Sequence, residues 1–139
     1  MEHEAGEHEH LRKIPFFEDL TPEDLERVAK IGDRRSFGPG DPIVAKGSEG
    51  QAMFIILSGR ATVDAGGKTH ELRAGSFFGE MALLGRRPRS ANVTAAEPTE
   101  CLVFEAMYFK PFLIKNPSMA VALLEGVVER LREVQDRIG

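Results

Sequence analysis

The sequence predicts a mainly β domain with flanking helices, in the form of an eight-stranded β-roll or jelly roll. Between positions 34 and 105, brief runs of β-forming residues are separated by ten glycines, a density of breaks typical of short strands joined by tight turns. Apolar residues at helical spacing flank this region on both sides. With 139 residues, the chain is long enough to enclose one hydrophobic core, so we expect a single domain over residues 11–139.

The segment before this domain is predicted to be a disordered tail. Residues 1–10 contain four Glu and three His, and almost nothing that a core could bury. His8 and His10 form an H-x-H pair that could bind a metal. No second cluster of ligands follows at strand spacing, so a solvated tail is the favoured interpretation.

A short helix is predicted next, from start signals at Thr21 and Pro22. Threonine suits the N-cap because its side chain accepts a hydrogen bond from the first turn, and proline suits the first helical position. Acidic residues in the first turn stabilise a helix, because they interact favourably with the positive end of its dipole. The supporting residues are the acidic Glu23 and Asp24, the staple of Leu20 with Leu25, and the apolar stripe of Leu25, Val28 and Ala29.

The clearest strands lie within residues 41–47, 52–59 and 60–65, and two more lie within 90–95 and 100–106. Residues 64–72 indicate a hairpin turned on Gly66 and Gly67, because glycine accepts the positive φ of a two-residue turn. Cys101 falls in the last strand and is the only cysteine. We therefore expect an inert buried thiol, and no internal disulfide is possible.

Two helices are predicted after residue 106. The first lies within residues 107–117 and stops before Pro117, and the second begins with Ser118 as its cap and runs to about Ile138. The second helix is amphipathic. Its apolar face holds Leu124, Val127, Val128, Leu131, Val134 and Ile138, and its other faces hold Glu125, Glu129, Arg132, Glu133 and Asp136.

Composition and charge exclude several classes of protein. The chain is 42% hydrophobic and 29% charged, and no run approaches the ~20 apolar residues of a membrane span. The N-terminus lacks the features of a secretory signal, so a cytoplasmic location is predicted. A net charge of −4 argues against a direct nucleic-acid partner. Without a nucleophile–base pair, paired acids or a metal cluster, we predict no enzymatic activity, no metal site and no cofactor.

The stretch from Phe78 to Ala95, FGEMALLGRRPRSANVTA, interrupts the strand pattern. Its part GEMALL shows no alternation and predicts a short helix inserted into the β-roll. The start of a helix exposes unpaired N–H groups and the positive end of its dipole, which together suit a phosphate oxygen. The small side chain of Ala82 would let a ligand approach the backbone there.

Arg89 follows Glu80 by nine residues and can hold a phosphate through two parallel hydrogen bonds. Pro88 stiffens the loop that carries this arginine, and Ser90 adds a hydroxyl donor. Glu80 would repel a phosphate unless it faced another part of the ligand, and a sugar hydroxyl is its natural partner. The pattern therefore favours a nucleotide.

These residues resemble the phosphate-binding cassette of the cyclic nucleotide-binding domain family. Catabolite-activator-type transcription regulators, regulatory subunits of cAMP-dependent kinase and cyclic-nucleotide-gated channels share this domain. The family pattern F-G-E-x-A-L, a short loop and P-R-[S/T/A]-A corresponds here to FGEMAL, LGRR and PRSA without a gap. The early strands, FGPGDPIVAKGSEGQAMFIILSGRATV, are similar as well, and the resemblance runs from about Leu11 through the final helix.

The resemblance implies a role for each matching residue of the cassette. Arg89 would pair with the cyclic phosphate, and Glu80 would accept a hydrogen bond from the ribose 2′-hydroxyl. Backbone N–H groups around Ala82 and Ser90 would complete the phosphate site.

The base would lie against an apolar wall that includes Val63 and Leu72. Arg130 stands at the spacing from Arg89 at which some channel domains carry a base-facing arginine. The ligand-binding residues so predicted are Phe78, Gly79, Glu80, Met81, Ala82, Leu83, Arg89, Ser90, Ala91, Val63, Leu72 and Arg130.

The function implied is that of a sensor that binds cAMP, with cGMP as the alternative. Its C-terminal helix would move onto the base like a lid, and a second copy or an effector domain would read its position. A serine after the arginine occurs in relatives that bind either nucleotide, so this residue leaves the ligand open.

Three other interpretations remain. The chain could be the sensor part of a transcription regulator, or an interaction module of the same fold that has lost its nucleotide. A cupin-type metalloenzyme is the third, but His70 is the only histidine in the β region.

Overall fold

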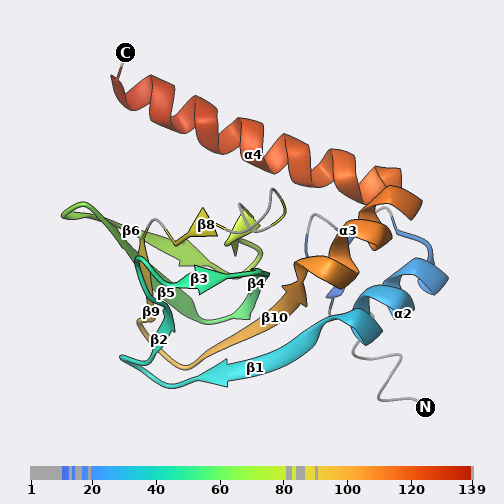
Figure 1. The fold of residues 1–139 in the computed structure, drawn as a ribbon, viewed down its shortest axis with the longest axis horizontal. Coiled ribbons are helices and arrows are strands. Elements are labelled where there is room, and N and C mark those ends of the chain that lie inside the picture. The colour runs from blue at the N-terminus through green and yellow to red at the C-terminus, as the bar shows by residue number, and fades with distance from the viewer. Residues whose placement is uncertain are drawn as a thin grey trace.

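The structure is a computed structural model that describes residues 11–12, 14, 17–18, 20–80, 83, 87–89 and 91–138, without the side chains of residues 49, 87, 88 and 134–138. The predicted tail, residues 1–10, lies outside the described residues. A β-roll is flanked by helices (Figure 1). In chain order the elements are α2 (Pro22–Ile31), β1 (Asp33–Phe37), β2 (Pro42–Val44), β3 (Glu49–Gly50), β4 (Ala52–Ser58), β5 (Arg60–Ala65), β6 (Lys68–Arg73), β7 (Phe77–Phe78), β8 (Arg87–Pro88), β9 (Asn92–Ala95), β10 (Thr99–Glu105), α3 (Ala106–Lys115) and α4 (Pro117–Ile138).

Two antiparallel four-stranded sheets form the roll, and they contain the eight strands that the sequence predicts. Sheet A has the order β1-β10-β4-β7, and sheet B has the order β2-β9-β5-β6. A separate ribbon of β3 and β8 sets Gly50 opposite Arg87. The prediction of a mainly β domain with flanking helices is confirmed.

The β5–β6 hairpin turns where the sequence predicts. Ala65 pairs with Lys68, so the turn contains only Gly66 and Gly67, whose φ angles are +63° and +83°. Both values lie in the left-handed region that glycine adopts without steric cost. The strands predicted within residues 41–47, 52–59, 60–65, 90–95 and 100–106 are also present, as β2, β4, β5, β9 and β10.

Sheet A separates two hydrophobic cores, which is why its central strand β4 is buried from Ala52 to Leu57 without alternation. Successive side chains of a strand point to opposite faces, so β4, β7 and β10 each contribute to both cores. The inner core, between the sheets, contains Ala52, Phe54, Ile56, Phe78, Cys101 and Val103 from sheet A and Ala61, Val63, Leu72 and Val93 from sheet B. The helix-side core contains Met53, Ile55, Leu57, Phe77, Leu102 and Phe104 with Leu25, Val28, Phe109, Phe112, Met119 and Leu123 of the helices.

The predicted start of α2 is confirmed in detail. The Thr21 hydroxyl accepts a hydrogen bond from the Asp24 backbone N–H at 3.1 Å, and Pro22 occupies the first turn. Leu25 and Val28 are fully buried in the helix-side core. The helix therefore anchors the chain against sheet A before β1 begins.

The predicted cap of α4 is wrong by two residues. The helix begins at Pro117, and the Asn116 carbonyl accepts hydrogen bonds from the N–H groups of Met119 and Ala120. Proline is favoured at the first helical position because its missing N–H would have no partner there. Asn116, rather than Ser118, thus stands at the junction of α3 and α4.

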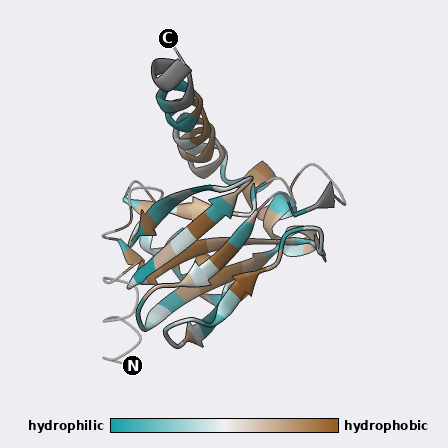
Figure 2. Ribbon diagram, turned by 90° about the vertical axis from the view of Figure 1, so that its left-hand side faces the viewer, coloured by the Kyte–Doolittle hydropathy of each residue, from teal (hydrophilic) through white to brown (hydrophobic). Residues whose placement is uncertain are grey.

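α4 carries two apolar stripes on different sides. Met119 and Leu123 are buried in the helix-side core. The predicted apolar face does not share this burial. The described side chains of this face are exposed, with exposed fractions of 60% for Leu124 and 57% for Leu131. Figure 2 shows α4 rising away from the roll toward the C-terminus.

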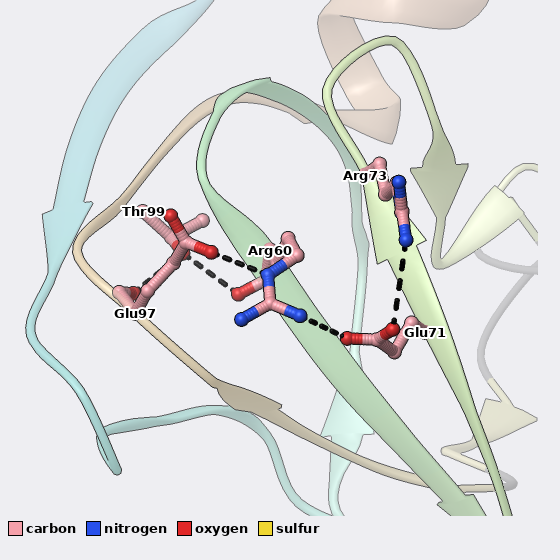
Figure 3. Close-up of polar contacts among 5 residues, drawn as sticks. All are labelled: Arg60, Glu71, Arg73, Glu97 and Thr99. Atoms are coloured by element: carbon pink, nitrogen blue, oxygen red, sulfur yellow. Dashed lines mark hydrogen bonds and ion pairs between the residues drawn. The ribbon is translucent and has the colours of Figure 1, made fainter.

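A polar network holds the start of β5 to the segment before β10 (Figure 3). The Thr99 hydroxyl lies 2.9 Å from the Arg60 carbonyl oxygen and 2.8 Å from that of Glu97. The Arg60 guanidinium forms ion pairs with Glu71 and Glu97, and these two carboxylates raise its pKa. The network fixes the edge of the roll where β5 begins.

Cys101 is a free, buried thiol, as predicted. Burial raises its pKa to about 12, and the neighbouring Glu100 acts in the same direction. In the described part of the chain, no helix is long and apolar enough to span a membrane. The cytoplasmic location stays a prediction.

Candidate functional site

The backbone of Arg89 is fixed to the turn before β3. Its N–H donates to the Ser48 carbonyl at 2.8 Å, and its carbonyl accepts from the Gly47 N–H at 2.8 Å. This pairing continues the β3–β8 ribbon. The backbone of the arginine that is predicted to bind phosphate is therefore held in place by hydrogen bonds.

The Arg89 side chain lies in a slot at the end of sheet A. Its Nη2 donates to the Ala52 carbonyl at 2.9 Å, its Nη1 lies 3.5 Å from the Gly79 carbonyl oxygen, and its Cζ lies 5.9 Å from the centre of the Phe54 ring. Burial lowers the pKa of Arg89, and the charges of Glu80 and Glu105 oppose that shift. The guanidinium is thus partly removed from water while its two hydrogen-bond acceptors are neutral carbonyls.

Two glycines make room for this guanidinium. Gly79 has a φ of +81°, and a Cβ added there would lie 2.8 Å from the Ala52 carbonyl oxygen and 2.9 Å from Nη1 of Arg89. A Cβ added at Gly50, on β3, would lie 2.6 Å from Cζ of Arg89 and closer still to Nε and Nη2. No side chain fits at either position while the guanidinium occupies the slot.

An aromatic pair forms the floor of the slot. Phe54 and Phe78 stack with ring centres 4.9 Å apart and planes 2° from parallel. Val63 and Leu72 are buried in the same inner core, and Ala91 packs against it. The two apolar residues predicted to face a base therefore share a core with the aromatic ring beneath Arg89.

The carboxylate of Glu80 is contacted by a side chain of α4. Nη1 of Arg130 donates to a Glu80 carboxylate oxygen at 3.0 Å, and Nη2 donates to the Phe77 carbonyl. The Arg130 guanidinium also lies 4.0 Å from the centre of the Phe77 ring. Three interactions with the segment 77–80 thus hold α4 over the cassette.

The predicted site residues fall into two groups around sheet A. Phe78, Gly79 and Arg89 lie together at the inner core, whereas Leu83 packs against the helix-side core. Glu80 and Leu83 have 3₁₀-helical backbones where the sequence predicts an inserted helix. Met81, Ala82 and Ser90 lie outside the described residues.

Sequence reasoning missed four residues of this site: Gly50, Ala52, Phe54 and Phe77. Ala52 contributes a backbone carbonyl, and Gly50 contributes the absence of a side chain, so neither carries a chemical signal. The unbroken apolar run of β4 could have indicated a strand buried on both faces, but not which arginine lies above Phe54. Among the described residues, no group of His, Cys, Asp or Glu could hold a metal ion.

Comparison with known proteins supports the predicted family. A model of the cyclic nucleotide-binding domain matches residues 34–116. A cGMP-dependent protein kinase of Toxoplasma gondii is 40% identical over 70% of this chain, and the cyclic AMP receptor protein of Thermus thermophilus is 33% identical over 88% of it. The chain spans only 10% of the kinase and 60% of the receptor protein.

The fold agrees with a solved structure as well. The crystal structure of the catabolite activator protein of Thermus thermophilus superposes with a TM-score of 0.77 and 32% identity, covering 89% of this chain and 61% of that one. From the family model, the sequence relatives and the shared fold, this chain belongs to the cyclic nucleotide-binding domain family, a regulatory rather than catalytic module.

Proposed function

We propose that this domain is a sensor that binds a cyclic nucleotide, with Arg89 holding the cyclic phosphate. The observation that carries this proposal is the environment of the guanidinium. It is partly removed from water, and among the described residues no carboxylate pairs with it. A desolvated cation of this kind is costly until an anion reaches it, and a phosphate offers two parallel acceptors to the guanidinium plane.

The rest of the nucleotide would lie between the slot and α4. Glu80 accepts a hydrogen bond from the ribose 2′-hydroxyl, and the base lies near Val63 and Leu72. The burial of these two residues in the inner core, beside the Phe54–Phe78 stack, supports an apolar wall for the base. Backbone N–H groups around Ala82 and Ser90 complete the phosphate site.

We assign cAMP as the ligand and keep cGMP as the alternative. The relative named for cyclic AMP matches 88% of this chain, against 70% for the relative named for cyclic GMP. The first match is long enough to include part of α4, the element that would face the base. The relative named for cyclic GMP is the more identical of the two, 40% against 33%, so a direct comparison of the two nucleotides decides between them.

The signal would be carried by α4. Arg130 and the ribose hydroxyl both need the Glu80 carboxylate, so the nucleotide changes the contacts that hold this helix. A ligand biases the helix only by its different affinity for the two helix positions. When the nucleotide binds, Arg130 either keeps its ion pair with Glu80 or moves to contact the base. The position of α4 then follows the contact that Arg130 makes.

The exposed stripe of α4 suits a partner that reads the helix position. Val121, Leu124, Val127, Val128 and Leu131 are exposed at helical spacing. We assign this stripe to a second copy of the chain or to an effector domain. An interaction module that binds no nucleotide is the second candidate function, and this same stripe is the observation that favours it.

The test is calorimetric titration of the purified chain with cAMP and with cGMP. We expect micromolar or tighter binding, and a loss of about 2 kcal/mol or more, roughly 30-fold in affinity, in Arg89→Ala. Arg89→Lys keeps the charge without the planar fork and should fall between the two. Arg35→Ala, at an exposed arginine of β1 paired with Asp33, is the control and should bind like the parent chain. Absence of heat with either nucleotide, on folded protein, would leave the interaction module as the function.

A further inference from the structure

The two glycines that flank Arg89 are glycine for different reasons. At Gly79, a φ of +81° puts the backbone in the left-handed region. Any side chain is therefore disfavoured at this position, whatever the space around it. Gly50 is not among the glycines with positive φ. Its backbone conformation accepts any L-residue, so the requirement for glycine at this position has another origin.

That origin is the Arg89 side chain. The three atoms nearest to a Cβ added at Gly50 are Nη2, Nε and Cζ of Arg89, and no backbone atom comes as near. A Cβ essentially never makes contacts this short, so one group has to move. The guanidinium is the far end of a flexible side chain, whereas the backbone of Gly50 is paired in the β3–β8 ribbon. A side chain at position 50 would therefore displace the guanidinium and leave the ribbon in place.

We propose that Gly50 is a positioning residue of the nucleotide site, where its missing side chain keeps the Arg89 guanidinium in its slot. In that slot the guanidinium is held at the Ala52 carbonyl and over the Phe54 ring, so it is oriented before a ligand arrives. A guanidinium has five N–H donors, and the two carbonyl contacts leave the others for a phosphate. Such preorganisation saves the ordering of a long side chain on binding. This inference rests on the proposed function, because its effect on affinity requires Arg89 to hold the phosphate.

The test compares Gly50→Ala with Gly38→Ala as a matched control. Gly38 also lacks a positive φ, and the nearest atom to an added Cβ is Oδ2 of Asp41 at an ordinary 3.4 Å. Two measurements are made on each variant: a ligand-free crystal structure, and calorimetric titration with cAMP. We expect Gly50→Ala to move the guanidinium off the Ala52 carbonyl, to lower cAMP affinity at least tenfold, and to change the melting temperature by less than about 3 °C. Gly38→Ala should keep both the guanidinium position and the affinity.

A double variant separates positioning from a general structural defect. If Gly50 acts through Arg89, adding Gly50→Ala to Arg89→Ala causes no further loss of affinity, whereas an independent defect of the ribbon would add to it. The inference is overturned if the guanidinium of Gly50→Ala stays in the slot, or if cAMP affinity is unchanged. If the parent chain binds no nucleotide, the proposed function fails, and the crystal structure of Gly50→Ala still decides whether Gly50 positions Arg89.

Discussion

Arg130 in α4 and Glu80 in the cassette form an ion pair at 3.0 Å across fifty residues of sequence. The pair joins the most C-terminal element of the fold to the segment between β7 and β8. Arg130 is also held by the carbonyl and the ring of Phe77, so the helix is attached through one side chain to two residues of the roll. The position of α4 therefore depends on a carboxylate that the ligand is expected to use.

Removing this side chain should loosen α4. We expect Arg130→Ala to lower amide hydrogen-exchange protection along α4 about fivefold, since a partly exposed charge-assisted hydrogen bond contributes about 1 kcal/mol. Arg132→Ala, two residues further on and paired to Glu129 of the same helix, should leave protection unchanged. Equal protection in both variants would mean that Met119 and Leu123 alone hold the helix.

Gly59 should be far less tolerant of alanine than Gly66. Both have positive φ, of +91° and +63°, so both substitutions impose left-handed strain of about 1 kcal/mol. At Gly59 a Cβ would also lie 2.6 Å from the Thr99 hydroxyl and closer still to the Pro98 carbonyl, whereas nothing lies within 4 Å at Gly66. We expect urea unfolding to show a loss of about 2–4 kcal/mol for Gly59→Ala, against about 1 kcal/mol for Gly66→Ala. Similar losses would contradict the packing described around Thr99.

The buried thiol predicts a loss of stability at alkaline pH. Burial raises the pKa of Cys101 from 9.0 to about 12 in the folded chain, so above pH 9 the unfolded chain releases a proton that the folded chain retains. The stabilising contribution is therefore complete below pH 9 and is lost between pH 9 and about 12, with a slope of up to about 1.4 kcal/mol per pH unit. Unfolding free energies of the parent chain and Cys101→Ala, measured from pH 8 to 11, should converge as the pH rises. Parallel curves would refute this linkage.

The exposed stripe of α4 should mediate self-association. Leu124 and Leu131 lie seven residues apart on the same side of the helix, at coiled-coil spacing. We expect light scattering to detect a dimer of the parent chain, and a monomer when both leucines are changed to glutamate. Glu129→Gln, at an exposed polar position of the same helix, is the control. A parent chain that is monomeric at all concentrations would assign the stripe to an effector domain.

Elements defined by neighbouring residues were predictable from the sequence. The start of α2 depends on Thr21 and Pro22, and the β5–β6 turn depends on Gly66 and Gly67, so each signal lies within a few residues of the structure that it specifies. The cap of α4 was mispredicted because Asn116 and Ser118 flank Pro117 and both suit an N-cap. Proline at the first helical position decides between them.

Features that depend on tertiary contacts were not predictable. The apolar stripe of α4 that includes Leu124 is evident in the sequence, but the helix packs on the roll through Met119 and Leu123. The cassette pattern indicated Glu80 and Arg89, whereas the roles of Gly50 and the Ala52 carbonyl follow from the pairing of β3 with β8. No periodicity or motif encodes which backbone carbonyl a distant arginine meets.

The two residues of β7 connect the arginines through a single peptide bond. Phe78 stacks on the ring beneath Arg89, and Phe77, on the opposite face of the same strand, lies beneath Arg130. Because successive side chains of a strand point to opposite faces, the rings of Phe78 and Phe77 share one backbone segment, and a displacement of β7 moves both. Sensors engineered from this domain would therefore have to keep both phenylalanines of β7, together with Val63 and Leu72 of sheet B, which are assigned to the base.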